Sequence, residues 1–456
     1  MRPLADGFAG AARSGLAAIC ASPTAARVPA GARLADGRLR SFRVLSPKVT
    51  RLSARPQAEP THGGAAVAAR DPRLDGLRGL AILLVMLYHT THYGMVRTKL
   101  EAALTIVPSV GWSGVDLFFV LSGFLITGIL LGARDGTSYY RVFYARRVLR
   151  IFPLYYATLA FFLLVVPQLP FFAAVDHFWN PGASREQFWY WLFLSNVQAA
   201  LSGAWHHQTL AISWSLAIEE HFYLLWPLVV RRASERRLLQ ICAVAIGAAL
   251  LLRAALVAGG ASPLAAYTLT PCRLDILATG AAIAILARRA GGLEAMARAA
   301  RAVLPVGLAL FVALQAWIRL GQPEATGYQA ITRQVLMLNN DPLMQTLGFS
   351  LLCAVYGALL VWVLTAPAAS WRARCFERKW LRSFGRYSYA MYLFHFFVAI
   401  LAVNVFTPGN HPQQYVLAQL CFWLLAIGVS YALARASWLL LEAPALRLKR
   451  FFPYRV

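Results

Sequence analysis

Ionisable side chains stand inside the apolar segments of this chain. The segment 73–90, RLDGLRGLAILLVMLYHT, carries Arg78 near one end and His89 near the other, with ten uncharged residues between them. On a helix the two would lie roughly 16 Å apart along the axis, at ~1.5 Å per residue. Guanidinium groups bind phosphates, and an imidazole exchanges protons near neutral pH. The pair therefore predicts a helix that binds an anion at one end and performs acid–base chemistry at the other.

Other ionisable residues interrupt the remaining apolar segments. They are Asp116, Glu219, Arg273, Asp275 and His395. A charged residue at the centre of a membrane helix costs at least ~2.5 kcal/mol on insertion scales, so each is a functional candidate. The alternative is that these groups pair with one another, or that the histidines are hydrogen-bonded in a packed interior. Arg273 and Asp275 are two residues apart and do not share a helix face, which favours pairing with other residues.

Composition places these candidates in a membrane. The 456 residues are 59% hydrophobic and 14% charged, with a mean hydropathy of +0.55. A soluble protein of this length needs a more charged surface. We expect an all-α, polytopic bundle of membrane helices, because the alternating short segments of a β-barrel are absent. The net charge of +25 is concentrated in short loops, so it indicates membrane topology and not nucleic-acid binding.

Eleven apolar segments can be distinguished, and ten are predicted to cross the membrane. If all eleven crossed, the basic loop RRASERR (231–237) would lie on the opposite side from the other basic loops. The short aromatic segment 187–202 is therefore predicted to be interfacial or re-entrant, with both termini in the cytoplasm. The segments are 76–95, 107–132, 151–167, 187–202, 212–230, 238–258, 270–287, 302–319, 345–366, 386–405 and 414–440. This topology places the ionisable groups where they can converge on one polar cavity in the outer half of the membrane.

The two ends of the chain differ from the membrane region. Residues 1–70 are rich in Ala, Arg, Gly and Pro, which predicts a disordered basic tail. A loose similarity to an organellar transit peptide and a start codon placed too early are the alternatives. Residues 71–447 form the predicted membrane domain, and 448–456 a basic cytoplasmic tail. The six cysteines form no CxxC pair, so neither a disulfide framework nor a metal site is indicated.

A set of motifs in a fixed order resembles a known family. The segments are RLDGLRGLAILLVMLYH, GVDLFFVLSGFLI, RRVLRIFPLYY, WSLAIEEHFYLLWP, RLDILATG, GRYSYAMYLFH and LEAPALR, and they span about residues 71–447. Together they resemble the integral membrane acyltransferase family 3, bacterial O-acyltransferases that modify polysaccharides and other acceptors. The resemblance implies transfer of an acyl group, often acetyl, from acyl-coenzyme A to a hydroxyl, in the bacterial inner membrane. It implies no metal and no bound cofactor beyond this co-substrate.

The family's functional motifs have counterparts here. Its Arg–His pair matches Arg78 and His89, and its Trp-Ser-Leu-x-x-Glu element matches Trp214, Ser215 and Glu219. His221 stands where many members have Gln or a carboxylate, and Glu220 or His221 remains an alternative to Glu219. The esterase-like domain that some members carry has no counterpart.

These residues suggest a mechanism. The phosphates of acyl-CoA would bind Arg78 and three basic residues at the cytoplasmic face. These are Arg146, Arg147 and Arg150. His89 would act as general base on the acceptor hydroxyl, oriented by Glu219 or Asp116. Trp214, Ser215 or Tyr223 would stabilise the oxyanion. Arg273, Asp275 and His395 are expected to line the substrate site. An acyl-histidine intermediate is a second route.

Two readings from other classes stay open. Intramembrane histidines and carboxylates also serve as proton relays, so a proton-coupled transporter or exporter of a polysaccharide precursor is an alternative. Transporters of this kind often contain an inverted repeat, and none is evident. The other reading is a structural partner of a polysaccharide synthase, in which the loss of His89 would leave function intact. The sequence indicates a carbohydrate or glycolipid acceptor only through the resemblance, and it does not give an oligomeric state.

Overall fold

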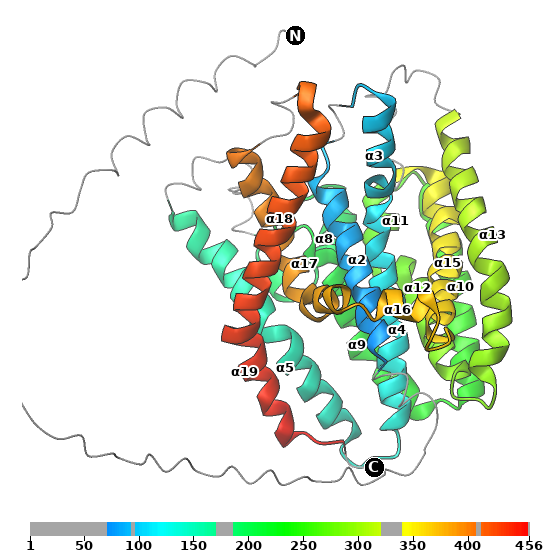
Figure 1. Cartoon of the computed structure of the whole chain (residues 1–456). Helices are drawn as coiled ribbons and strands as arrows, with labels where there is room; N and C mark the ends of the chain where they lie inside the picture. Colours follow the sequence, from blue (N-terminus) through cyan, green and yellow to red (C-terminus); the bar gives the residue numbers. More distant parts are fainter. Residues whose placement is uncertain (1–70, 93–95, 170–185, 321–339, 407–411, 455–456) are drawn as a thin grey trace, which may run out of the picture. The chain divides into compact units, whose positions relative to one another are not determined.

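The computed structural model describes residues 71–92, 96–169, 186–320, 340–406 and 412–454, and the basic tail predicted at 1–70 lies outside them. Every regular element in these ranges is a helix, as the sequence predicted. Figure 1 shows the helices packed together as a bundle. Their bounds are α2 Pro72–Thr90, α3 Lys99–Ser109, α4 Gly114–Gly132, α5 Tyr139–Ala160, α7 Phe188–Trp191, α8 Ser195–Ser202, α9 Ser213–Arg232, α10 Glu235–Ala258, α11 Pro263–Thr268, α12 Leu274–Leu286, α13 Gly292–Leu320, α15 Phe349–Leu364, α16 Trp371–Phe376, α17 Lys379–Val405, α18 Tyr415–Ser437 and α19 Ala443–Arg447.

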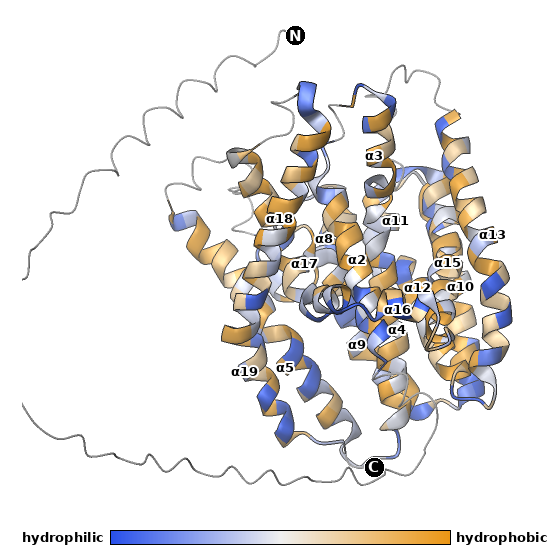
Figure 2. Ribbon diagram, viewed as in Figure 1, coloured by the Kyte–Doolittle hydropathy of each residue, from blue (hydrophilic) through white to orange (hydrophobic). Residues whose placement is uncertain are grey.

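Seven helices of the described chain are long and apolar enough to cross a membrane. They are 99–132, 139–168, 235–258, 292–320, 344–364, 379–403 and 415–451. Helices α2, α9 and α12 fall outside this set, because α2 and α9 carry several charges and α12 has only 13 residues. Hydrophobic residues dominate most helices, and hydrophilic residues gather on the lower parts of α5 and α19 (Figure 2). The chain is thus a multi-pass helical membrane protein, while the count of ten crossings remains a prediction.

The segment 187–202 does not form one spanning helix. It divides into α7, of four residues, and α8, of eight. Phe193 between them adopts φ 55°, a left-handed conformation that a residue with a side chain seldom takes. Its ring stacks on Tyr155 at 4.1 Å between centroids, which holds the break in place. The prediction that this segment is not a crossing helix is confirmed, and its interfacial position stays a prediction.

Glycines allow the central helices to approach closely. Helix α2 packs against α17 and α4, and α4 packs against α12. A Cβ added at Gly385 of α17 would lie 1.8 Å from the carbonyl oxygen of Asp75 in α2. A Cβ at Gly123 of α4 or at Gly280 of α12 would lie 2.0 Å from a carbonyl oxygen of the facing helix. Small residues at such crossings let backbones touch, which is how helices associate where water does not drive packing.

The C-terminal residues pack against α5. The chain continues from α18 through a π-helical turn, Trp438–Glu442, into α19 and the turn Leu448–Phe451. Arg146 of α5 donates to the carbonyl oxygens of Lys449 at 3.4 Å and Phe452 at 2.9 Å. The segment predicted as a basic tail at 448–456 thus contacts the bundle as far as its described residues extend.

Candidate active site

Two cavities adjoin inside the bundle, and Val115 and Tyr392 line both of them. The first has a volume of about 110 Å³ and is called the arginine cavity; its polar lining includes Arg78, Ser122, Arg147, Arg150, Ser215 and Glu219. The second has a volume of about 500 Å³ and is called the histidine cavity; its lining includes His89, Tyr88, Trp112, Trp205, Trp214 and Tyr267. Val115 and Tyr392 therefore mark the place where the two cavities are adjacent.

A pair of imidazoles from α2 and α17 lies beside the histidine cavity: His89 lines it, whereas His395 is fully buried behind His89 and, contrary to the expectation from the sequence, does not line either cavity. Nδ1 of His89 lies 3.1 Å from Nε2 of His395 and 3.0 Å from the carbonyl oxygen of Val85. Nδ1 of His395 lies 2.7 Å from the carbonyl oxygen of Tyr392. A carbonyl oxygen can only accept, so we assign a proton to each Nδ1.

This assignment fixes the role of each remaining nitrogen. With a proton on its Nδ1, neutral His395 can only accept at Nε2, so the single Nδ1–H of His89 is shared between the carbonyl oxygen of Val85 and Nε2 of His395. The Nε2 of His89 then carries a lone pair, and it makes no hydrogen bond with the described residues. The pair thus leaves one basic nitrogen on a side chain that lines the cavity, as a general base requires.

The end of α2 that carries His89 is held by α18. The side-chain amide of Gln419 donates to the carbonyl oxygen of Thr90 and accepts from the backbone N–H of His92, both at 2.9 Å. The hydroxyl of Tyr415 donates to the carbonyl oxygen of His92 at 2.7 Å. These bonds satisfy backbone groups that the end of a helix leaves without partners. The position of His89 is therefore fixed by α17 on its imidazole and by α18 on the turn that follows.

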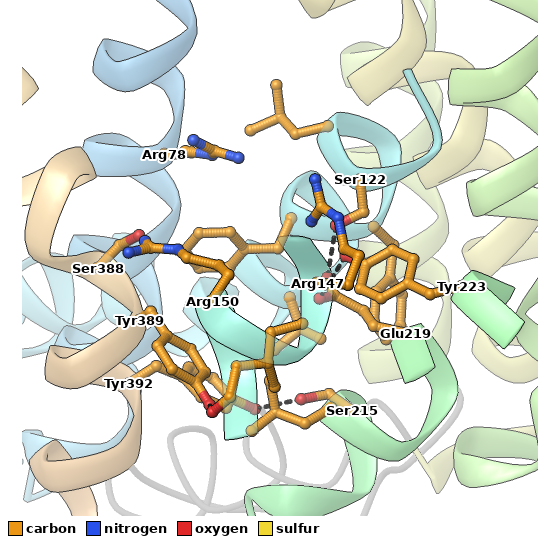
Figure 3. Close-up of a pocket in the computed structure, with 16 residues that line it drawn as sticks. Arg78, Ser122, Arg147, Arg150, Ser215, Glu219, Tyr223, Ser388, Tyr389 and Tyr392 are labelled. Atoms are coloured by element: carbon orange, nitrogen blue, oxygen red, sulfur yellow. Dashed lines mark hydrogen bonds between the residues drawn. The ribbon is translucent and has the colours of Figure 1, made fainter. Parts of the chain in front are cut away.

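Glu219 lies among cationic side chains in the arginine cavity (Figure 3). Its carboxylate accepts from Ser122 Oγ at 2.7 Å and from the hydroxyl of Tyr223 at 2.9 Å. The guanidinium of Arg147 lies over the ring of Tyr223, 5.2 Å from its centroid. Neutral donors hold both carboxylate oxygens, and Arg147 makes no ion pair within 4.0 Å in the described part of the protein.

The other two cavity arginines are held differently. Nη1 of Arg150 lies 3.1 Å from Glu442 Oε2, and its guanidinium lies between the rings of Tyr389 and Trp438. Arg78 is partly exposed, and its Nη1 makes a long ion pair of 3.7 Å with Oδ1 of Asp75, one turn earlier on α2. Three guanidiniums and the carboxylate of Glu219 line the cavity, while the carboxylates of Glu442 and Asp75 lie behind Arg150 and Arg78; guanidiniums at a cavity wall suit an anionic ligand.

Asp116, Arg273 and Asp275 line neither cavity. Asp116 pairs with Arg273, and Asp275 pairs with Arg253 of α10 at 2.8 Å. All four side chains are buried, and they join α4, α10 and the start of α12. Pairing of Arg273 and Asp275 with other residues, favoured by their spacing, is confirmed. Buried charges of this kind need their partners, so the ion pairs connect these helices.

The structure corrects the expectation that one cavity collects all the ionisable groups. Neither Glu219 nor Asp116 contacts His89 in the described part of the chain; the group beside His89 is His395. Arg146 lies outside the arginine cavity, on the C-terminal residues. The direction in which each side chain points around its helix was not predictable from the sequence.

Three residues that contact the site or its frame were missed or misread. Arg253 is a lone charge inside the apolar segment 238–258, which was a sufficient signal. Glu442 lies in the motif LEAPALR, where nothing in the sequence connects it with Arg150. Tyr392 was not singled out, because a tyrosine in a membrane helix is often an interface anchor; it is only 6% exposed and lines both cavities.

The loop before α9 contributes to the mouth of the histidine cavity. Trp205 and Gln208 line the cavity, whereas His207 is buried beside them and accepts from the backbone N–H of Leu210 at 3.3 Å. Burial lowers the pKa of His207 to about 4, so this imidazole is neutral near pH 7. It serves the loop structure and does not supply a charge. Across the described ranges, no cluster of three or more His, Cys, Asp or Glu residues could hold a metal ion.

Comparisons with known proteins show the family of this chain. A family model described as an acyltransferase domain matches residues 71–435. The chain is 29% identical to YrhL of Bacillus subtilis, over 82% of this chain and 54% of that protein. It is 27% identical to the peptidoglycan O-acetyltransferase OatA of Listeria monocytogenes, over 84% and 57% of the two chains, and 25% identical to the O-acetyltransferase OatA of Staphylococcus aureus, over 79% and 56%. The chain thus spans a little over half the length of these relatives. No solved structure matches it.

Proposed function

The chain belongs to the acyltransferase domain family, the membrane acyltransferase family 3 that its motifs resemble, and we propose that it is a membrane O-acetyltransferase that uses acetyl-CoA. The observation that carries this proposal is the junction of the two cavities. One is suited to a phosphorylated donor, the other contains a basic imidazole nitrogen, and they share two lining residues. A transferase needs this arrangement, because donor and acceptor must meet at one carbonyl carbon.

The arginine cavity is the proposed donor site. Coenzyme A carries several phosphates, and guanidiniums bind phosphate oxygens in pairs through a planar fork. Arg147 and Arg78 are free of strong ion pairs in the described structure, so they can turn toward a ligand. Arg150 is held in place by Glu442 before any ligand arrives. The thioester would then extend from the arginines toward Val115 and Tyr392.

His89 is the proposed general base. Its Nε2 takes the proton from the acceptor hydroxyl as the hydroxyl oxygen attacks the thioester carbonyl carbon, whose π electrons move to the carbonyl oxygen. The tetrahedral intermediate collapses, the C–S bond breaks, and the thiolate receives the proton from His89 to give coenzyme A and an ester. His395 keeps the ring of His89 in the productive tautomer, the role that a carboxylate plays in a Ser-His-Asp triad. This proposal replaces Glu219 and Asp116 as the orienting groups.

The histidine cavity is the proposed acceptor site. Its volume of about 500 Å³ accommodates a sugar ring, and Trp112, Trp205 and Trp214 offer flat apolar faces. The C–H faces of sugar rings stack on such surfaces while their hydroxyls point to the edges. The relative from Listeria monocytogenes is named a peptidoglycan O-acetyltransferase, and the one from Staphylococcus aureus an O-acetyltransferase. These features support a cell-envelope polysaccharide, such as peptidoglycan, as the acceptor.

The proposed location is the bacterial inner membrane with both termini in the cytoplasm. The basic residues of α5 would then face the cytoplasm, where acetyl-CoA is made, and the histidine cavity would open toward the opposite side. A reporter fused after Arg237 tests this orientation, since a periplasmic signal there contradicts it.

The function is tested by supplying radiolabelled acetyl-CoA to membranes with and without the protein. We expect label in the polysaccharide fraction only when the protein is present, and the labelled fraction identifies the acceptor. An absence of label from acetyl-CoA, with sugar acceptors present, contradicts the proposed donor. Transport of a polysaccharide precursor without any labelling would instead favour the transporter reading.

A further inference from the structure

Tyr392 has a position that the mechanism above does not use. It is one turn before His395 on α17 and lines both cavities. Donor and acceptor must share one reacting carbonyl group, so that group has to lie where the cavities meet. Of the two residues that line both, Val115 has no polar side-chain atom. Tyr392 is therefore the only residue on both lining sets with a hydrogen-bond donor to offer.

The hydroxyl of Tyr392 belongs to a closed set of hydrogen bonds. It lies 2.7 Å from Ser215 Oγ and 3.1 Å from the carbonyl oxygen of Ile212, and Ser215 Oγ lies 3.2 Å from the same carbonyl. The two hydroxyl groups and the carbonyl oxygen of Ile212 thus lie within hydrogen-bond distance of one another, and two hydroxyl protons are available for these three contacts. When Ser215 donates to Ile212, Tyr392 donates to Ser215; when Tyr392 donates to Ile212, Ser215 donates to Tyr392. Either arrangement can release the tyrosine proton with small movements.

An oxyanion is a stronger acceptor than the partners that Tyr392 has at rest. Hydrogen bonds to ionised oxygens are about twice as strong as those between neutral groups. If the Tyr392 O–H turns to a developing oxyanion, Ser215 can still donate to the tyrosine oxygen and so polarise it. In Figure 3 the Ser215–Tyr392 pair lies on the opposite side of the cavity from Arg78. A donor with its phosphates at the arginines would extend in the direction of this pair.

We infer that Tyr392 is a catalytic residue, whose hydroxyl donates to the oxyanion of the tetrahedral intermediate, and that Ser215 positions that hydroxyl. This inference rests on the proposed acetyl transfer and adds the group that stabilises its charged intermediate. The proton on His89 and the negative charge on the carbonyl oxygen arise together when the acceptor attacks. The pair His89–His395 would stabilise the positive charge, and the pair Ser215–Tyr392 the negative charge; α17 contributes one residue to each pair.

The test replaces one hydroxyl at the junction and one elsewhere. Tyr392→Phe removes the proposed donor and keeps the ring. Tyr356→Phe is the matched control, because Tyr356 is also buried and its hydroxyl lies 2.7 Å from Ser113 Oγ, outside both cavities. We expect Tyr392→Phe to lower kcat about 100-fold with KM for acetyl-CoA nearly unchanged, as loss of one oxyanion donor does elsewhere. Tyr356→Phe should retain wild-type kcat.

Other outcomes overturn the inference. A wild-type kcat in Tyr392→Phe would show that the hydroxyl does not act in the reaction. Equal losses in both variants would make the effect one of folding, and a raised KM with normal kcat would make Tyr392 a donor-binding residue. Wild-type protein that transfers no acetyl group from acetyl-CoA would refute the proposed function itself, and this inference with it. Ser215→Ala should lose only a few-fold in kcat, because Tyr392 keeps its position through Ile212.

Discussion

The crossing of α2 and α17 determines whether the imidazoles of His89 and His395 meet, and Gly385 is its tightest point. The Cβ of Gly385→Ala would lie 1.8 Å from the carbonyl oxygen of Asp75, about 1.6 Å inside the 3.4 Å at which ordinary contact begins. Neither backbone can move aside as a flexible side chain does, so the helices must separate or slide. Overpacking of this kind typically costs about 1–3 kcal/mol of unfolding free energy.

The same displacement should reach the active site. His395 lies ten residues after Gly385 on α17 and its bond to His89 is already 3.1 Å long. A separation of the helices by about 1 Å would remove that bond, since hydrogen bonds weaken beyond ~3.5 Å. We expect Gly385→Ala to lower the thermal unfolding midpoint in detergent and to reduce acetyl transfer at least about tenfold, beyond the loss of folded protein.

The control for Gly385 is a glycine with free space around it. Nothing lies within 4 Å of a Cβ added at Gly428 of α18 or at Gly247 of α10. Alanine is the better helix former by about 1 kcal/mol, so these variants should be as stable as the wild type or more so. If Gly385→Ala unfolds and reacts as Gly428→Ala does, the close crossing does not govern the site and the reasoning fails.

Two further substitutions separate binding from stability. Arg150→Lys loses the planar guanidinium that would bind both Glu442 and a phosphate, so KM for acetyl-CoA should rise about tenfold, which corresponds to about 1.4 kcal/mol. Arg146→Lys, outside the cavity, should leave KM unchanged. Equal changes of KM for both variants in steady-state assays would reject the proposed donor site. Asp116→Asn leaves buried Arg273 without its ion-pair partner, which should destabilise the protein by about 3–5 kcal/mol. Asp135→Asn, at an exposed position, should leave the stability unchanged. An Asp116→Asn variant with wild-type thermal stability and low kcat would instead indicate that Asp116 is a catalytic residue.

The sequence predicted the class of fold because hydrophobicity along the chain is a local property. Ten apolar segments correspond to helices or helical stretches of the structure, and 187–202 was separated from them by counting basic loops. Ten crossings were predicted and seven helices of the described chain are long and apolar enough to cross, because α2 and α9 carry charged residues and α12 has only 13 residues. Membrane orientation depends on the lipid bilayer and the insertion machinery, and the cytoplasmic location of both termini stays a prediction.

The site was only partly predictable, because contacts between distant segments depend on how helices rotate against each other. His89 and Arg78 were found from their spacing on one helix. The bond between His89 and His395 joins residues 306 positions apart, and it exists because glycines bring α2 and α17 together. Nothing local distinguishes Asp116, which pairs with Arg273, from Glu219, which faces a cavity. Both are carboxylates in apolar segments, and only packing separates their roles.

The most direct test of the account concerns His89 as the base. Purified wild-type protein and His89→Ala would be supplied with radiolabelled acetyl-CoA and a sugar acceptor, with binding of a non-hydrolysable acetyl-CoA analogue measured in parallel. The account predicts that His89→Ala binds the analogue as the wild type does but transfers acetyl about 10²–10⁴-fold more slowly, the usual contribution of a general base. Transfer at the wild-type rate would make the imidazole pair structural. Label trapped on His89 in the wild type would contradict the base mechanism in favour of an acyl-histidine intermediate.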